Sequence, residues 1–278
     1  MSLLLLSVVT VAASAGQNAG TPPGDTALVN RALAAELQAA RDTTHPMRYR
    51  LHKTSPRLTS TKEIVETRDG AVAQLMEVFD KPLSQADAQK EQARLNALLA
   101  DPGRQRHRRQ TQADDTGRAL KVLRVMPRAF VYKYAGTVES GSGTLQKFTF
   151  SPNLKFDAPD LETLALSALN GEIWIDATRE RVVRLEGHLQ QDVDFGWGIL
   201  GRLNKGGWIV LEQADVGGGQ WRVVRFSMAM SGRVLFKTRS FDTTEEESQF
   251  APVPLGLSYQ QAIQMMRAGE VEAGSEGR

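Results

Sequence analysis

The spacing of apolar residues switches between helical and strand periods along the chain. Apolar residues recur at helical spacing over 26–41, which predicts a first helix. Residues 46–54 and 62–81 predict strands, and Asp69-Gly70 is typical of a hairpin turn inside the second segment. Helical spacing returns over 84–126, where Asp101-Pro102-Gly103 separates two predicted helices. The first half of the chain therefore predicts a helix, a few antiparallel strands and a helical insertion.

Strand-like alternation dominates the chain beyond Pro127. It recurs up to about residue 250 and is interrupted by one short helix that is predicted over 158–171. Gly217-Gly218-Gly219 and Ser231-Gly232 are typical of tight turns between antiparallel neighbours. A last helix is predicted over 258–269. The pattern predicts an α+β fold, in which a long antiparallel sheet is interrupted by the insertion 84–126 and covered by other helices.

The N-terminal residues and the absence of cysteine bear on the compartment. An apolar run from Leu3 to about Val11 precedes Ala13-Ser14-Ala15, which predicts a signal peptide over residues 1–15 and export of the remainder. We expect a single domain over 26–269. The chain has no cysteine, so a lipid anchor on cysteine and disulfide bonds are not expected. The sequence therefore predicts a soluble exported protein.

The net charge argues against nucleic acid as a partner. The formal charge is +2 with a sequence pI of about 8.9, which is too little excess for a nucleic-acid interface. Arg104, Arg106, His107, Arg108 and Arg109 form a basic cluster that could contact anionic headgroups or RNA. Acidic residues follow within two turns, so we interpret the cluster as a solvated helix face.

Residues 195–201, FGWGILG, contain the glycine spacing of a dinucleotide-binding loop. Such a loop needs a helix immediately after the glycines, whereas here two further glycines and then a strand follow. We therefore predict no nicotinamide or flavin binding. The segment 194–205 is instead an unusually apolar connection, either a plug for the sheet or a rim that contacts cargo or a membrane through Phe195, Trp197, Ile199 and Leu200.

No other motif indicates catalysis, a cofactor or a metal site. The sequence lacks a cysteine nucleophile, H-E-x-x-H, G-x-S-x-G and a phosphate-binding P-loop. The four histidines, His45, His52, His107 and His188, do not have ligand spacing. An acidic stretch, Asp242 with Glu245–Glu247, is interpreted as a solvated strand end that discourages further pairing. We expect no enzyme activity, no catalytic residue, no cofactor and no metal ion.

Several predicted strands share a face of large apolar side chains. These side chains are candidates to line an apolar binding cavity, and methionine tolerates variable chain shapes. The alternative is a filled core. The candidate lining residues are Phe130, Tyr132, Tyr134, Phe148, Phe150, Val224, Phe226, Met228 and Met230.

The strand rhythm of residues 130–250 resembles a known fold. The phrases GEIWIDATRERVVRLEGHL, KGGWIVLEQADV and GGQWRVVRFSMAMSGRVLFKTRSF are similar to the C-terminal half of proteins with the LolA/LolB-like lipoprotein-carrier fold. The resemblance implies a strongly curved antiparallel sheet, an incomplete β-barrel whose concave face is covered or filled by helices. It also implies a periplasmic carrier that shelters acyl chains. The insertion 84–126 is larger than this resemblance leads us to expect.

Three hypotheses follow for the function. The first is an exported, periplasmic lipid- or lipoprotein-binding carrier, a monomer whose partner is a lipid or lipidated protein and for which transient membrane contact is an option. The second is a non-catalytic envelope scaffold with a filled barrel. The third is an enzyme with an unfamiliar site. An apolar cavity favours the first, whereas a polar pocket with shifted carboxylate or histidine pKa values favours the third.

Overall fold

A thirteen-stranded antiparallel sheet is the framework of the protein. The computed structural model describes residues 24–141, 143–195, 201–234 and 237–276. The strand order is β4-β3-β2-β1-β13-β12-β11-β8-β7-β6-β5, and β10 pairs with both β12 and β9. The strands are β1 (Met47–Ser55), β2 (Leu58–Val65), β3 (Val72–Val78), β4 (Lys81–Pro82), β5 (Phe130–Ser140), β6 (Gly143–Pro152), β7 (Leu169–Asp176), β8 (Arg181–Leu189), β9 (Val193–Phe195), β10 (Gly201–Leu203), β11 (Trp208–Asp215), β12 (Trp221–Val234) and β13 (Lys237–Pro252).

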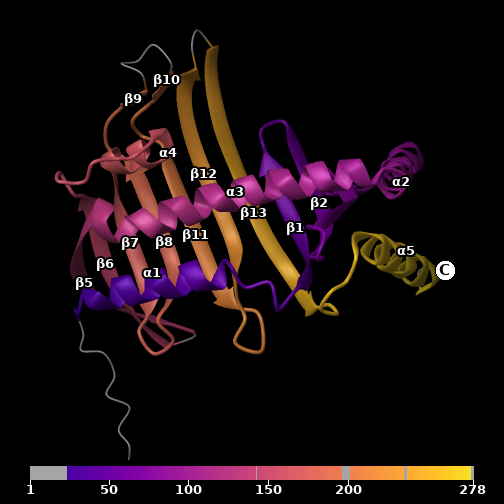
Figure 1. Cartoon of the computed structure of the whole chain (residues 1–278), viewed down its shortest axis with the longest axis horizontal. Coiled ribbons are helices and arrows are strands. Elements are labelled where there is room, and N and C mark those ends of the chain that lie inside the picture. Colours follow the sequence, from indigo (N-terminus) through magenta and orange to yellow (C-terminus); the bar gives the residue numbers. More distant parts are fainter. Residues whose placement is uncertain (1–23, 142, 196–200, 235–236, 277–278) are drawn as a thin grey trace, which may run out of the picture.

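The sheet is curved and open, and α1 and α3 cross one face of it (Figure 1). The predicted α+β class and curved antiparallel sheet are confirmed, and the sheet does not close into a barrel. The first strand in sequence, β1, pairs with the last, β13, so the N-terminal hairpin extends the C-terminal meander. The helices are α1 (Ala27–Ala39), α2 (Gln85–Ala100), α3 (Pro102–Ala129), α4 (Leu161–Leu164), which continues as a 3-10 turn over Ala165–Ala168, and α5 (Tyr259–Glu276). None of the described helices is long and apolar enough to cross a membrane.

Local sequence explains where the helices of the insertion begin and end. The Ser84 side chain caps α2 by accepting a hydrogen bond from the Asp87 N–H. At the break between α2 and α3, the Asp101 carboxylate accepts from the Gly103 N–H at 2.9 Å, and Pro102 occupies the first helical position. The predicted separation at Asp101-Pro102-Gly103 is confirmed, although α3 continues past residue 126, through Pro127.

Three packed clusters fix the helices to the sheet. The first cluster joins α1 and the C-terminal part of α3 to β5–β8, and fully buried Phe148 and Ile173 lie in it. The second joins α2 and α5 to the β2–β3 hairpin through Leu95, Ile263 and their neighbours. The third is smaller and centres on Leu189. A buried ion pair lies beside the first cluster. In it, the Glu36 carboxylate of α1 accepts two hydrogen bonds from the Arg181 guanidinium, both at 2.9 Å.

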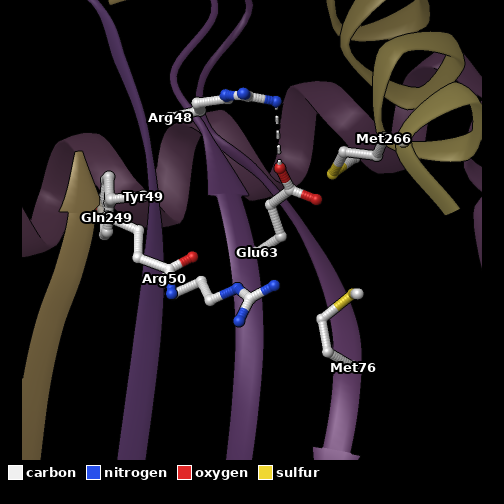
Figure 2. A pocket seen from close by; sticks show the side chains of 8 residues that line it. Arg48, Tyr49, Arg50, Glu63, Met76, Gln249 and Met266 are labelled. Atoms are coloured by element: carbon white, nitrogen blue, oxygen red, sulfur yellow. Dashed lines mark ion pairs between the residues drawn. The ribbon is translucent and has the colours of Figure 1, made fainter. Parts of the chain in front are cut away.

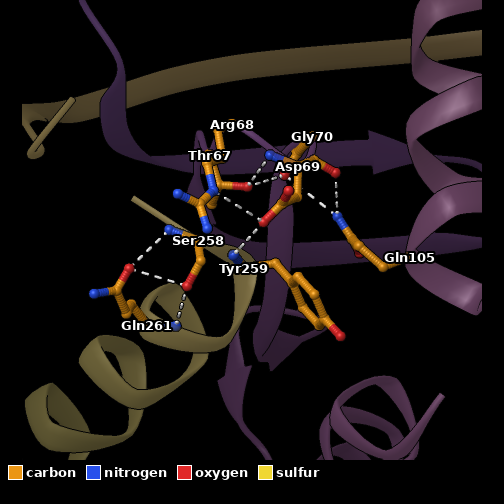
Figure 3. A network of polar contacts seen from close by, with 8 residues as sticks. All are labelled: Thr67, Arg68, Asp69, Gly70, Gln105, Ser258, Tyr259 and Gln261. Carbon is orange, nitrogen blue, oxygen red and sulfur yellow. Dashed lines mark hydrogen bonds and ion pairs between the residues drawn. The ribbon is translucent and has the colours of Figure 1, made fainter. Parts of the chain in front are cut away.

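The β2–β3 turn connects to α3 and α5 through polar contacts (Figure 3). The Asp69 carboxylate accepts from the Tyr259 N–H at 3.2 Å, and the Gln105 side-chain amide donates to the Asp69 carbonyl at 2.8 Å. Ser258 and Gln261 form a capping box at the start of α5, in which each side chain accepts from the other residue's N–H. The predicted hairpin at Asp69-Gly70 is therefore also a junction between two helices.

Two sequence-based expectations about the C-terminal strands are wrong. Ser231-Gly232 does not turn the chain, because β12 continues to Val234. Gly232 is needed for a different reason: a Cβ there would lie 2.4 Å from the Arg202 carbonyl of β10. The acidic stretch around Glu245 is not a strand end either, because it lies inside β13 and pairs with both β1 and β12.

Candidate functional site

The convex face of the sheet carries a row of charged residues. Directly opposed residues in neighbouring strands share a face, so the register defines this row from β6 to β1. Positive and negative side chains alternate in much of it, and the Trp174 ring lies between the Lys147 and Arg184 cations at 5.6 and 5.3 Å. Such a face is suited to solvent. The row comprises Lys147, Trp174, Arg184, Glu212, Arg225, Glu246 and His52.

The concave face carries an apolar row instead. Cross-strand pairs connect Phe148, Ile173, Leu185, Leu211 and Phe226 in order from β6 to β12. Four neighbouring side chains on β11 and β12 belong to none of the three packed clusters and are only half-buried. We call these four residues the strip: Ile209, Leu211, Phe226 and Met228.

The predicted lining residues on β5 and β6 lie against helices. Phe130, Phe148 and Phe150 are buried in the first cluster. Tyr132 packs against this cluster, and its hydroxyl donates to the Met126 carbonyl at 3.1 Å. Tyr134 is 40% exposed beside Phe148, with ring centroids 5.7 Å apart. This part of the concave face is occupied by α1 and α3.

The predicted lining residues on β12 have a more open environment. Phe226 and Met228 belong to the strip, and Met230 packs against the third cluster. Val224 lies at a bulge, where the pairing with β11 shifts between Arg225 and Val223. All four side chains are half-buried. The structure thus divides the predicted lining into a packed part and a half-exposed part.

The middle of α3 passes in front of β11, β12 and β13 (Figure 1). Every residue from 113 to 119 is exposed, so this segment does not pack on the strands behind it. We call residues 113–119 the strap. Gly117, within it, has no other atom within 4 Å of the position that a Cβ would take. The strap is therefore loosely surrounded at this position.

Both ends of α3 are anchored although the strap is not. Towards the N-terminus, the Gln112 side chain accepts from the Ala71 N–H at 3.0 Å and donates to the Ala71 carbonyl at 3.1 Å. Gly70 allows this close approach, because a Cβ there would lie 2.7 Å from the Gln112 oxygen. Towards the C-terminus, Val125 and Met126 are buried in the first cluster. Contacts on both sides of the strap therefore fix the position of α3, while the strap itself stays exposed.

A pocket of about 620 Å³ opens beside the strap. Its walls come from the end of α1, from Arg109 and Thr116 of α3, and from the loops that flank β1 and β2. Arg222 contributes to its floor, where it donates to the His45 carbonyl at 2.6 Å and pairs with Glu66 at 3.5 Å. The pocket is mixed in character, with charged groups near the end of the sheet.

The concave face becomes charged where β13 follows β12. Phe226 of the strip is paired with Glu245, which forms an ion pair with Lys53 at 2.6 Å. Burial raises the pKa of the Glu247 carboxyl to about 7, with contributions from Glu245 and Glu66 against an opposing effect of Arg222. Sequence reasoning missed this group because it assigned the acidic stretch to a solvated strand end.

Phe195 and Gly201, the two described residues of FGWGILG, lie in a strand pair that adjoins the third cluster. Gly201 begins β10, which is paired antiparallel with β9, and no helix follows it. A dinucleotide loop requires that helix, so the geometry does not fit the motif. Phe195 is half-buried against the third cluster. Trp197, Ile199 and Leu200 lie outside the described residues.

The remaining polar groups of the described residues form local pairs. Within the described ranges, no three His, Asp or Glu side chains are placed to hold a metal ion. Each of three histidines contacts a carboxylate: His45 contacts Asp42, His52 contacts Asp80 and His188 contacts Glu186. A smaller pocket of about 290 Å³ lies between β1–β3 and α5, where the Arg48 and Glu63 side chains are 3.9 Å apart (Figure 2). Arg48 and Glu63 lie on the convex face, so this pocket does not extend the strip.

The comparisons with known proteins give only a weak structural likeness. No family model and no curated protein matches the sequence. Among solved structures, the chain is similar to a Vibrio parahaemolyticus domain described as an outer membrane lipoprotein-sorting protein. The match has 11% sequence identity and a TM-score of 0.31, and it covers 83% of this chain and 94% of that one.

Proposed function

We propose that the protein binds an acyl chain between the strip and the strap. The observation that carries this proposal is the pairing of two unpacked surfaces: a half-buried apolar strip and an exposed helical segment that crosses in front of it. In a filled core, the strip would be covered by apolar side chains of α3. Instead, the strap has the sequence ADDTGRA, which offers no large apolar side chain to the sheet.

The free energies involved are sufficient for useful binding. An acyl chain of about 15 methylenes in water costs on the order of 12 kcal/mol, at ~0.8 kcal/mol per methylene. Part of this is recovered when the chain contacts Phe226, Met228 and their neighbours instead of water. Methionine and phenylalanine accommodate different chain shapes, which suits a carrier that must also release its ligand.

The cellular role that we propose is that of an exported lipid or lipoprotein carrier. The apolar run and the Ala13-Ser14-Ala15 site in the N-terminal segment support export, and the absence of cysteine supports a form without a lipid anchor. Within this proposal, Trp197, Ile199 and Leu200 contact cargo or membrane at the rim of the sheet. Over β5–β8 the concave face is packed by the first cluster, and this part of the sheet favours the second candidate, a scaffold with a filled concave face.

A fluorescent acyl probe distinguishes the carrier from the filled scaffold. We expect the wild-type protein to bind the probe saturably and to increase its emission. Met228→Trp places a larger side chain in the proposed space, so it should weaken binding while the free energy of unfolding changes little.

The matched control is Arg225→Trp, on the same strand and on the convex face. It introduces the same ring and should leave probe affinity within about twofold of wild type. Equal loss of affinity in both variants, or no probe binding by folded wild-type protein, would overturn the proposal.

A further inference from the structure

A second pocket, of about 440 Å³, lies at the other end of the concave face between α2, α3 and the β2–β3 hairpin. One wall is apolar, with Leu75 and Val78 half-buried and Leu58 44% exposed. Lys62 lies beside this apolar surface as the cross-strand partner of Leu75, and the helices α2 and α3 contribute Glu91, Arg94 and Arg108. The pocket is therefore lined by both apolar and cationic side chains.

Glu91 and Arg94 neutralise each other in this pocket. The Arg94 guanidinium donates to both Glu91 oxygens, at 2.7 and 2.6 Å, and the Glu91 carboxylate also accepts from the Leu75 N–H at 2.9 Å. Arg94 further donates to the Ala73 carbonyl at 2.5 Å. These contacts attach α2 to β3. Because the charges of Glu91 and Arg94 are paired with each other, neither is free to bind a charged ligand.

Arg108 has no such partner. Its guanidinium is half-buried, and its Nε is buried without a hydrogen-bond acceptor. Burial lowers the pKa of Arg108 and repulsion from Arg94 adds to this effect, while attraction to Glu91, which is already bound by Arg94, opposes it. Within the described residues, no carboxylate forms an ion pair with Arg108 or with Lys62 on β2. A cation kept partly out of water without a counter-ion is costly, unless a ligand supplies the missing charge.

We propose that Lys62 and Arg108 bind a phosphate group whose apolar substituent lies against Leu58, Leu75 and Val78. A guanidinium presents a planar fork of donors to phosphate oxygens, and an ammonium adds a point charge beside it. The basic residues of α3 that precede and follow Arg108 are exposed, so a phosphate approaching from solvent meets a positive field first.

This site is separate from the strip. Three steps along the sheet, from β12 through β13 and β1 to β2, separate them, which corresponds to about 14 Å at about 4.8 Å per strand. The Glu245–Lys53 ion pair lies on the same face between them. The inference therefore goes beyond the proposed acyl site, and either one can fail while the other stands.

The test is isothermal titration of the full chain at fixed ionic strength. The three probes are a short-chain phosphatidic acid, the matching diacylglycerol without phosphate, and inorganic phosphate. In the Met228→Trp background, which blocks the proposed acyl site, we expect saturable binding of the phosphatidic acid and no binding of the diacylglycerol. Inorganic phosphate that binds within threefold of the phosphatidic acid identifies a free-phosphate site. Inorganic phosphate that binds at least tenfold more weakly identifies a lipid headgroup site.

Two variants and one control complete the experiment. Arg108→Gln and Lys62→Gln should each weaken phosphatidic acid binding at least tenfold, whereas Arg106→Gln removes an exposed charge from the same helix and should change it less than twofold. Thermal unfolding separates binding from structure, because removal of an unpartnered half-buried cation should not lower the melting temperature. Equal losses in all three variants, destabilisation by Arg108→Gln, or absence of phosphate binding would overturn the inference. Met228→Trp should leave phosphate binding unchanged.

Discussion

Phe148 and Phe226 lie in the same cross-strand row, so truncating each of them compares the packed and the open part of one surface. Phe148 is fully buried in the first cluster, and its replacement by alanine should lower the free energy of unfolding by about 3–5 kcal/mol. Phe226 is half-buried outside the packed clusters. Full burial of such a ring is worth about 1.5–3 kcal/mol, so Phe226→Ala should cost only about 1–2 kcal/mol.

Ligand binding should respond in the opposite way. A bound acyl chain would cover the exposed part of the Phe226 ring and gain up to about 1 kcal/mol from it, so Phe226→Ala should weaken binding about fivefold. Urea unfolding followed by tryptophan fluorescence measures the stabilities, and titration with an acyl fluorophore measures the affinity. A stability loss for Phe226→Ala as large as that for Phe148→Ala would refute the reasoning, because it would mean that the strip is packed core.

Further predictions concern a carboxyl, the strap and the loop. The raised pKa of Glu247, about 7 against an ordinary 4.5, means that the folded state binds its proton more tightly, so stability falls as pH rises from about 4.5 to 7. Glu247→Gln should remove this slope and stabilise the protein at pH 8 by about 1–2 kcal/mol, after discounting for partial exposure, as measured by urea unfolding at both ends of the range. Gly117→Ala should strengthen the strap helix by about 1 kcal/mol and slow acyl-probe entry in stopped-flow experiments; an unchanged entry rate would mean that the strap does not move during binding. Trp197→Ser should leave stability nearly unchanged while it weakens membrane or lipid binding, and a large loss of stability would instead identify the loop as core.

Sequence patterns predicted the turns and helix ends whose conformation depends only on neighbouring residues. Asp69-Gly70 turns a hairpin, and Asp101-Pro102-Gly103 ends one helix and starts the next, because backbone preferences and side-chain caps act over a few residues. Alternation likewise identified most strands. Ser231-Gly232 misled because glycine also occurs where another backbone approaches closely, and here β10 is that neighbour. A local pattern does not distinguish these two uses of glycine.

Long-range pairing determined the charged part of the concave face. The acidic residues of β13 pair with β1, which lies near the other end of the chain, and Lys53 meets Glu245 across 192 residues of sequence. The sequence shows both charged residues, but it does not show that they lie close together in the fold. The same holds for Arg108, which reads as one arginine among several on a solvated helix until α2 and the β2–β3 hairpin enclose it.

By itself, the sequence determined the α+β class, the antiparallel sheet, the helical insertion and the existence of an apolar face, because hydrophobic period and turn chemistry are properties of short segments. Only the tertiary structure decided which part of that face is filled. Phe148 and Phe226 have similar surroundings in sequence, yet α1 and the end of α3 cover the first, whereas Phe226 stays partly exposed on β12, a strand in front of which α3 passes (Figure 1). Burial depends on what another segment places opposite a side chain, and that information is spread over the whole chain.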